Sequence, residues 1–508
     1  MGHPEQAHFA PRGIPRSIQS HRNRCSFASI PRRIFSYAGF RGAGRADTAL
    51  LGWHSFLNVR WPELNARNYK SRETMVNQMS NSQLAAANML CTKQIGRWAL
   101  VALALAFCAG HGISKDQFTP VVISPLMPAT RPFLGTDGRR HVVYELVLTN
   151  ANATPATLQK LEVLDASDTG KVLATLGGSD LLPHLRTTGN SPVQSAEIEF
   201  NGTRLFLIDL DFSSQTALPR RLLHRVELLG GATPSHKPDT PAPLTYTGAP
   251  IELRIAPITI GPPLYGKGWV AANGCCRVTG VHRSSSLSVN GGIFFAQRFA
   301  IDWMQLDNKG QLVHGDPSDV RNYPSYGADV IAVADGKVVS TLNTLDDQKP
   351  GTLPDPKTIN VENVDGNHVV LDLGNGVYAF YAHMVKGSVV VAVGNRVKRG
   401  QLLGKLGNTG NTSAPHLHFH LMDGPSVLGS QGLPYVIDSF VLAGQIPIGK
   451  FEAAPGIEGD WSEGMFPTPS PRKNQYPMDL AVVDFAARLT AGAAGARKAS
   501  PPPAIKKP

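Results

Sequence analysis

The stretch that most constrains this chain of 508 residues is Gly400–Leu421, in which Gly- and Asn-rich turns lead into alternating histidines. Residues 416–420 read His-Leu-His-Phe-His. Successive side chains of a β-strand point to opposite faces, so the histidines would share one face while Leu417 and Phe419 enter a core. Neutral imidazole is a common ligand of zinc-like ions. The pattern predicts a strand that presents histidines to a metal, and the alternative is an exposed strand with chance histidines.

The charge distribution argues against a nucleic-acid-binding protein, although the formal net charge is +11. Residues 1–112 contain 14 Lys and Arg against 4 Asp and Glu, whereas the remainder contains 35 against 34. The basic character therefore belongs to the N-terminal segment. No basic patch interleaved with aromatic residues is found in the body of the chain, so we expect no nucleic-acid partner.

A short apolar segment, Trp98–Ala109, follows Lys93 and Arg97 and precedes small residues. This layout is typical of a secretory signal peptide, and twelve apolar residues are too few to span a bilayer comfortably. A buried helix is the alternative. We expect an unassigned basic extension at 1–92, a signal peptide at 93–112, and a periplasmic or secreted product with no stable membrane span.

The predicted fold class is all-β, with two domains. Residues 113–262 contain short alternating or β-branched runs such as His141–Leu148 and Thr203–Phe212, which predict an immunoglobulin-like β-sandwich. Residues 263–445 alternate strand-like runs with Gly-Asn, Asp-Gly and Asn-Gly turns and predict a second β domain. Residues 446–508 are rich in Pro, Gly and Ala and predict a C-terminal tail, with disorder at Met465–Pro471 and Ala491–Pro508 and one short strand or helix at Asp479–Arg488.

Two cysteines, Cys275 and Cys276, lie after the predicted signal peptide. Neighbouring cysteines rarely bridge each other. The sequence therefore predicts no disulfide framework.

The second β domain resembles the lysostaphin/LytM-type zinc metalloendopeptidases, whose catalytic fold is the duplicated-hybrid-motif domain. Ala414–Phe419 (APHLHF) is similar to their (G/A)PHLHF signature, and Phe380–His383 (FYAH) to their Y-A/S-H strand. The resemblance implies a LytM-like peptidase domain that binds Zn²⁺ and cleaves peptidoglycan peptides. It also implies roles for four residues: Asp302 and His418 as metal ligands, and His383 and His416 in catalysis.

One departure from this family concerns the remaining ligand. The family normally has a histidine four residues before the aspartate, and Arg298 occupies that position here. A guanidinium is permanently charged and cannot ligate a cation. If Asn290–Gly292 formed a three-residue hairpin loop, His282 would lie opposite Ala300 on the face of Asp302. We therefore predict His282 as the third ligand; a two-residue turn would place it on the wrong face, and a surface hairpin histidine is the alternative.

Three functions remain open from the sequence. The first is a secreted zinc endopeptidase of bacterial cell-wall peptidoglycan. The second is a catalytically inactive LytM-like module that binds the cell wall or a partner hydrolase. The third is a protein whose sandwich binds glycan or protein while the second domain is a scaffold. Retention of His383 and His416 beside Asp302 and His418 favours the first, because a binding module has no need of this polar set.

Overall fold

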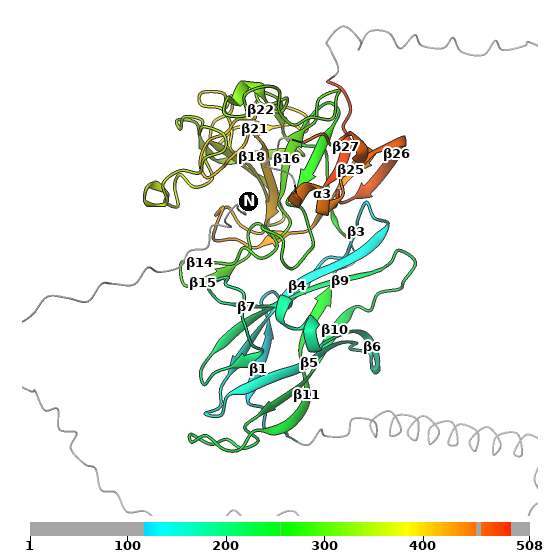
Figure 1. Cartoon of the computed structure of the whole chain (residues 1–508), viewed down its shortest axis with the longest axis vertical. Coiled ribbons are helices and arrows are strands. Elements are labelled where there is room, and N and C mark those ends of the chain that lie inside the picture. Colours follow the sequence, from blue (N-terminus) through cyan, green and yellow to red (C-terminus); the bar gives the residue numbers. More distant parts are fainter. Residues whose placement is uncertain (1–115, 255, 454–458, 489–508) are drawn as a thin grey trace, which may run out of the picture. The chain divides into compact units, whose positions relative to one another are not determined.

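A computed structural model describes residues 116–254, 256–453 and 459–488 (Figure 1). The predicted basic extension and signal peptide at 1–112 lie outside these residues. Within the described ranges, no helix has the length and apolar character needed to cross a membrane.

The first half of the described chain consists of two β-sheets. One has the order β1-β4-β9-β7 with β3 beside β4, and the other has the order β2-β11-β10-β5-β6 with β8 beside β5 (Figure 1). Side chains from both sheets form one hydrophobic core, so the sheets pack face to face. The assignment of this sandwich to the immunoglobulin-like class stays a prediction. The strands are β1 (Val121–Pro125), β2 (Ala129–Thr130), β3 (Phe133–Leu134), β4 (Arg139–Asn150), β5 (Ala156–Asp165), β6 (Asp168–Gly177), β7 (Leu185–Thr187), β8 (Glu197–Ile198), β9 (Thr203–Ser213), β10 (Arg221–Gly230) and β11 (Ala242–Leu253).

Strict alternation in β10 builds the inner face of the second sheet. Leu222, Val226 and Leu228 are buried in the core, and the residues between them are more exposed. His224 belongs to the same buried face, where its Nδ1 donates to the carbonyl of Ala249 and its Nε2 accepts from the hydroxyl of Tyr144. These two hydrogen bonds satisfy both ring nitrogens, which is the condition for burying a polar group without a large cost.

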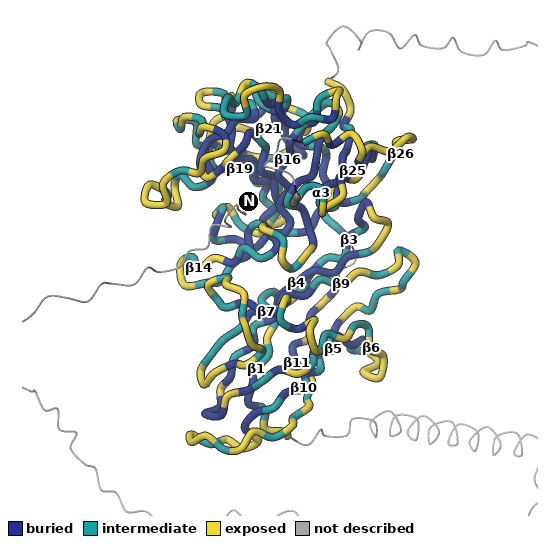
Figure 2. Tube along the Cα trace, viewed as in Figure 1, coloured by how far each residue is buried: buried dark blue, intermediate teal, exposed yellow. Residues whose placement is uncertain are grey.

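The second half is dominated by a 12-stranded sheet of order β12-β25-β27-β13-β16-β23-β20-β19-β18-β21, with β24 beside β23 and β26 beside β25. The pairs β14-β15 and β17-β22 form two small sheets. Figure 2 shows buried residues along the central strands and exposed residues at the connecting loops. The elements are β12 (Ile258–Ile260), β13 (Trp269–Ala272), β14 (Leu287–Val289), β15 (Gly292–Phe294), β16 (Ile301–Gln305), β17 (Asp329–Ile331), β18 (Gly336–Leu342), β19 (His368–Gly374), β20 (Val377–Ala382), β21 (Arg396–Val397), β22 (Leu402–Lys405), β23 (Leu417–Met422), β24 (Gly432–Leu433), β25 (Tyr435–Gln445), α3 (Ile448–Ala453), β26 (Met465–Gln475) and β27 (Ala481–Asp484).

The predicted disorder of Met465–Pro471 is wrong, because this stretch begins β26 of the large sheet. The short strand or helix predicted within Asp479–Arg488 is confirmed as β27, which lies between β25 and β13. The prolines that suggested disorder, Pro467, Pro469 and Pro471, alternate along β26. Among the pairings of the described residues, β26 pairs with β25 alone, and an edge strand tolerates the missing N–H groups of proline on its free side.

The cysteine prediction also needs correction, because Cys275 and Cys276 form a disulfide across a cis peptide bond. Both residues are buried in the main core of the second half.

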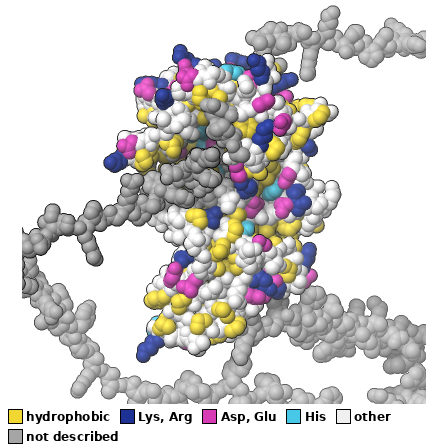
Figure 3. Space-filling model, viewed as in Figure 1, with side chains coloured by type: hydrophobic (Ala, Val, Ile, Leu, Met, Phe, Trp, Pro, Cys, Tyr) yellow, Lys and Arg dark blue, Asp and Glu magenta, His cyan; other side chains and the backbone are white. Residues whose placement is uncertain are grey.

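On the face drawn in Figure 3, basic and acidic side chains are interspersed, in line with the nearly balanced charge after residue 112.

The buried histidine of the sandwich makes its stability depend on pH. Burial lowers the pKa of His224 from 6.5 to about 4. The unfolded chain therefore takes up a proton between these values and the folded chain does not, so stability is complete above pH 6.5 and falls as the pH drops toward 4. We expect the free energy of unfolding of the wild-type protein to fall by roughly 2 kcal/mol between pH 7 and pH 5 because of this residue.

Chemical denaturation of wild type and His224→Gln at the two pH values measures this loss. Glutamine can donate and accept hydrogen bonds but does not titrate, so the variant is expected to lack this part of the pH dependence. Equal pH dependence in the two proteins would contradict the assignment.

Candidate metal centre and catalytic cleft

The site is built on three neighbouring strands of the large sheet. β23 lies between β16 and β20, and His418 is directly opposite Asp302 on one side and Ala382 on the other. Leu417 and Phe419 are fully buried in the main core, on the other face of β23. The alternation predicted from the sequence is therefore confirmed: one face of β23 packs and the other faces the site.

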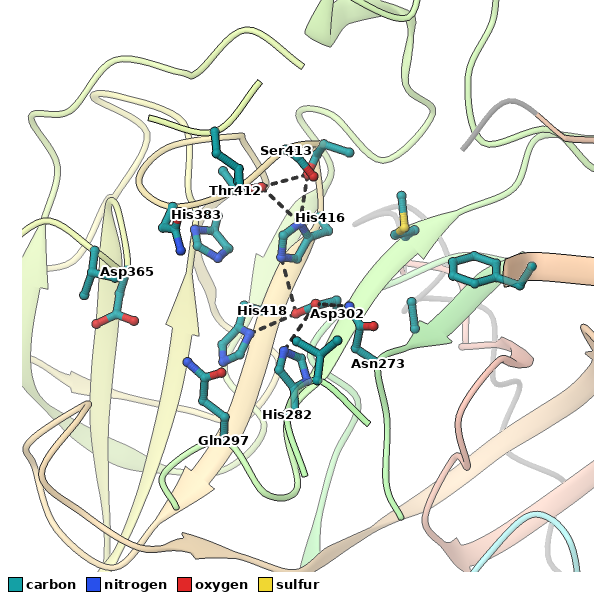
Figure 4. Close-up of a pocket in the computed structure, with 18 residues that line it drawn as sticks. Asn273, His282, Gln297, Asp302, Asp365, His383, Thr412, Ser413, His416 and His418 are labelled. Atoms are coloured by element: carbon teal, nitrogen blue, oxygen red, sulfur yellow. Dashed lines mark hydrogen bonds and ion pairs between the residues drawn. The ribbon is translucent and has the colours of Figure 1, made fainter. Parts of the chain in front are cut away.

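Asp302 is the centre toward which the polar side chains converge (Figure 4). Its Oδ1 accepts from His418 Nδ1 at 2.9 Å and lies 3.3 Å from His416 Nε2. Its Oδ2 accepts from Asn273 Nδ2 at 2.8 Å and lies 3.3 Å from His282 Nε2. Ile301 and Trp303 flank it in sequence and point into the core, so the alternation of β16 turns the carboxylate toward the cleft.

His282 lies beside Asp302, but not for the predicted reason. The β14-β15 hairpin pairs Val289 with Gly292, so its turn has two residues rather than three, and the predicted register is wrong. His282 precedes this hairpin and lies in a separate turn. That turn buries the ring and lets its Nδ1 donate to the carbonyl of Ala300 at 3.2 Å, which directs Nε2 to the carboxylate.

Arg298 does not enter the cluster. It lies in a turn before β16, where its backbone N–H bonds to the carbonyl of Phe295. Its guanidinium forms an ion pair with Glu145 at 2.7 Å and a hydrogen bond with Gln431. The guanidinium charge is therefore paired with Glu145 rather than directed at Asp302.

The two predicted catalytic histidines are held in similar ways. His416 Nδ1 donates to the carbonyl of Ala414 at 2.8 Å, and His383 Nδ1 donates to the carbonyl of Thr409 at 2.7 Å. Because a carbonyl only accepts, each ring carries its proton on Nδ1 and presents Nε2 to its surroundings. The ring centroids of His383 and His416 are 4.7 Å apart, and those of His383 and His418 are 5.9 Å apart.

His383 reaches this position through an unusual backbone. It directly follows β20, in which Tyr381 faces the main core and Ala382 faces the same side as His418. Continued alternation would send residue 383 into the core. Its φ of 63° lies in the left-handed region, which non-glycine residues adopt rarely and often at functional sites. This conformation directs the imidazole into the cleft.

The pKa values of the buried carboxylate and imidazoles depend on one another. Burial by itself would raise the pKa of Asp302, but the adjacent imidazoles of His282 and His416 hold that pKa well below its usual range. Burial acts to lower the pKa of His282 and His416, and the carboxylate outweighs it and raises both. Burial lowers the pKa of His383 well below its usual value, and repulsion from His416 and His418 adds to this. Asp302 is therefore ionised and His383 neutral.

These side chains line a cleft of about 360 Å³. Sequence reasoning missed three residues here: Asn273, which donates to Asp302; Thr409, which anchors His383; and Asp365. Asp365 lies beyond His383 in Figure 4, and burial raises its pKa to about 7. Thr409 lies within Gly400–Leu421, but its bond to His383 joins segments 26 residues apart, which local spacing does not predict. Asn273 and Asp365 carry no motif signal of their own.

Three groups of side chains among the described residues have donor atoms close enough to hold a metal ion. The predicted set, His282, Asp302 and His418, is entirely buried, with donor atoms within 4.8 Å of one another. A second set overlaps it: His383, His416 and His418. The third contains Cys276, whose sulfur is in the disulfide with Cys275 and has no thiolate to offer.

Comparison with known proteins points to one family. Residues 322–428 match Peptidase family M23, a range that contains His383, His416 and His418 but not His282 or Asp302. The chain is 44% identical over 57 residues to the peptidoglycan DD-endopeptidase ShyA of Vibrio cholerae serotype O1, covering 11% of this chain and 13% of that protein. It is 34% identical over 129 residues to the glycyl-glycine endopeptidase ALE-1 of Staphylococcus capitis, covering 24% and 30%.

Among solved structures, the catalytic domain of lysostaphin from Staphylococcus simulans is 24% identical, with 33% of this chain and 88% of that chain covered. The TM-score is 0.19, too low to support an argument about the fold.

The chain covers less than a third of the length of either curated relative, the Vibrio cholerae and the Staphylococcus capitis endopeptidase.

The two overlapping donor sets make different predictions for metal binding. If His282, Asp302 and His418 hold the ion, His282→Ala should weaken zinc affinity by at least about tenfold, whereas His383→Ala should leave it nearly unchanged. Zinc affinity of the purified protein, measured by competition with a chromophoric chelator, tests this. His314→Ala is the matched control, since His314 is about half exposed and outside the cleft. Loss of affinity in His383→Ala alone would place the ion in the other set.

Proposed function

Because the 322–428 segment belongs to the M23 peptidase family, of the lysostaphin/LytM type, we propose that this chain is a zinc-dependent endopeptidase that hydrolyses peptide bonds of bacterial peptidoglycan. The observation that carries the proposal is the convergence of His282, His416 and His418 within 3.3 Å of the Asp302 carboxylate. The named relatives, a peptidoglycan DD-endopeptidase and a glycyl-glycine endopeptidase, indicate the substrate class. Such a substrate also agrees with the periplasmic or secreted location expected from the sequence.

The donor set fits zinc. Two imidazoles and one carboxylate are a typical catalytic zinc set, which leaves a position open for the substrate or water. The hydrogen bond from His282 Nδ1 to the carbonyl of Ala300 is of the kind that orients a ligating imidazole. His420 is the corresponding neighbour of His418, with its Nδ1 3.0 Å from His418 Nε2. When bound by these residues, zinc supplies a Lewis acid for the scissile carbonyl.

We assign the proton transfers of the reaction to His383 and His416. His383 is neutral and presents an unprotonated Nε2, so it is suited to accept a proton from the attacking water. His416 has a raised pKa beside Asp302, so it is suited to donate a proton to the leaving amine or a hydrogen bond to the developing oxyanion. Two groups whose surroundings push their pKa values apart are the usual basis of an acid–base pair.

The position of Arg298 argues against the inactive binding module. That alternative depends on a metal site lost where arginine replaces histidine. The guanidinium is ion-paired with Glu145, and His282 lies beside Asp302 instead. A donor set of three side chains is therefore still present, together with both catalytic histidines.

Removing either catalytic histidine should separate catalysis from metal binding. We expect His383→Gln and His416→Gln each to slow the clearing of a peptidoglycan suspension by roughly 100-fold or more. Zinc content, measured on the same samples, should stay at the wild-type level. A chelator should abolish clearing by the wild type, and added zinc should restore it.

His314→Gln serves as the control and should clear the suspension at the wild-type rate, because its side chain is solvent-exposed. Wild-type protein that is loaded with zinc and leaves peptidoglycan intact would overturn the proposed function. Chelator-resistant clearing would overturn its metal dependence.

A further inference from the structure

A buried glutamate of the sandwich ties the two halves of the molecule together next to the candidate metal centre. Glu145 lies in β4 with no exposed surface. Its Oε1 accepts from Arg283 Nη1 at 2.7 Å, and its Oε2 lies 2.7 Å from Arg298 Nη1. Arg283 and Arg298 are also almost fully buried. These three residues are called the Arg–Glu–Arg triad below.

The triad lies on the outer face of β4. Tyr144 and Leu146 point into the core of the sandwich, whereas Val143, two residues before Glu145, belongs to the core of the second half. Leu205 and Leu207 of the adjacent strand β9 pack with Phe295 of the second half in a further cluster. The outer face of this sheet is therefore an internal interface, and Glu145 is a charged residue placed within it.

Arg283 is the residue of the triad that adjoins the candidate metal centre. It immediately follows His282 in sequence. Besides Glu145, its guanidinium donates to the backbone carbonyls of Tyr144 and Ile208, both at 3.0 Å. Three hydrogen bonds from one buried side chain thus fix the main chain next to His282 against two strands of the sandwich.

Short-range hydrogen bonds hold the turn that carries His282 in shape. Ser284 N–H and its hydroxyl both donate to the carbonyl of Gly280, and the Ser285 hydroxyl donates to the carbonyl of His282. These bonds shape the turn but do not determine where it lies relative to β16. Its position depends on longer-range contacts: the bond from His282 Nδ1 to Ala300, the anchoring of Arg283 and, at the start of the segment, the bond from Arg186 Nη2 to the carbonyl of Val278 at 3.1 Å.

We propose that Glu145 is a positioning residue for the metal centre: it anchors Arg283 in the sandwich and so holds the His282 imidazole against Asp302. Glu145 also pairs with Arg298 in the interface. Arg298 occupies the position at which the related peptidases carry a histidine ligand. The sandwich is then a structural part of the metal site, supplied by a segment more than 130 residues upstream of His282. The inference depends on the proposed function only for the identity of the ion.

A direct Glu145→Gln change would leave two buried arginines without a counter-charge, and such a protein can fail to fold. Arg283→Met and Arg298→Met each leave one arginine paired with Glu145, so the remaining pair is balanced. Glu162→Gln is the matched control in the same sandwich. Glu162 is nearly buried and bonds to Arg225 Nε at 2.6 Å, in the sheet that does not contain β4.

The experiment measures zinc affinity of the full chain by chelator competition, after circular dichroism has established that each variant is folded. We expect Arg283→Met to weaken zinc affinity by about tenfold or more, as for other residues that orient a ligand. Arg298→Met should have a smaller effect, and Glu162→Gln should stay within about twofold of wild type. A folded Arg283→Met protein with wild-type affinity would overturn the proposal, as would an equal loss in Glu162→Gln.

A second readout needs no metal. In metal-free protein labelled with ¹⁵N-histidine, the His282 imidazole signals should move in Arg283→Met and remain in place in Glu162→Gln. If they move while wild-type protein fails to hydrolyse peptidoglycan, the positioning role stands and the proposed function fails. If wild type hydrolyses peptidoglycan and Arg283→Met alters neither readout, the positioning role alone fails.

Discussion

The ionised carboxylate of Asp302 is the constraint on which the rest of the site depends. A buried carboxylate is costly unless opposite charge or hydrogen-bond donors surround it. Three imidazoles and the amide of Asn273 provide these donors from three separate segments of the chain. The same arrangement that makes burial of the charge tolerable also directs nitrogen donors to one point, which is what a divalent cation requires.

The large sheet can support this site because each of its central strands has one face committed to packing. Leu417 and Phe419 of β23 and Ile301 and Trp303 of β16 are buried in a single core. The residues between them are consequently aimed at the opposite side with little freedom. His383 is the exception, because its left-handed backbone supplies a direction that strand alternation would not give.

The role of the sandwich follows from the chemistry of its outer face. A sheet that presented only apolar residues there could pack against the second half in several ways, whereas Glu145 requires its two arginines at fixed positions. In some proteins, buried polar or ionic groups contribute less to stability than to the choice of one arrangement. Under the positioning role proposed for Glu145, that arrangement also determines where His282 lies, so docking of the halves and assembly of the candidate metal centre would be one event.

The sequence by itself determined the all-β class and the alternation of β23, because both follow from local patterns of apolar and polar residues. It also placed Asp302, His383, His416 and His418 in one family pattern. Only the tertiary structure decided how His282 approaches Asp302, where Arg298 finds its ion-pair partner, and that the Pro-rich Met465–Gln475 segment forms an edge strand. Each of these depends on which distant segments lie side by side, and a hairpin register that differs by one residue is enough to defeat a prediction from local spacing.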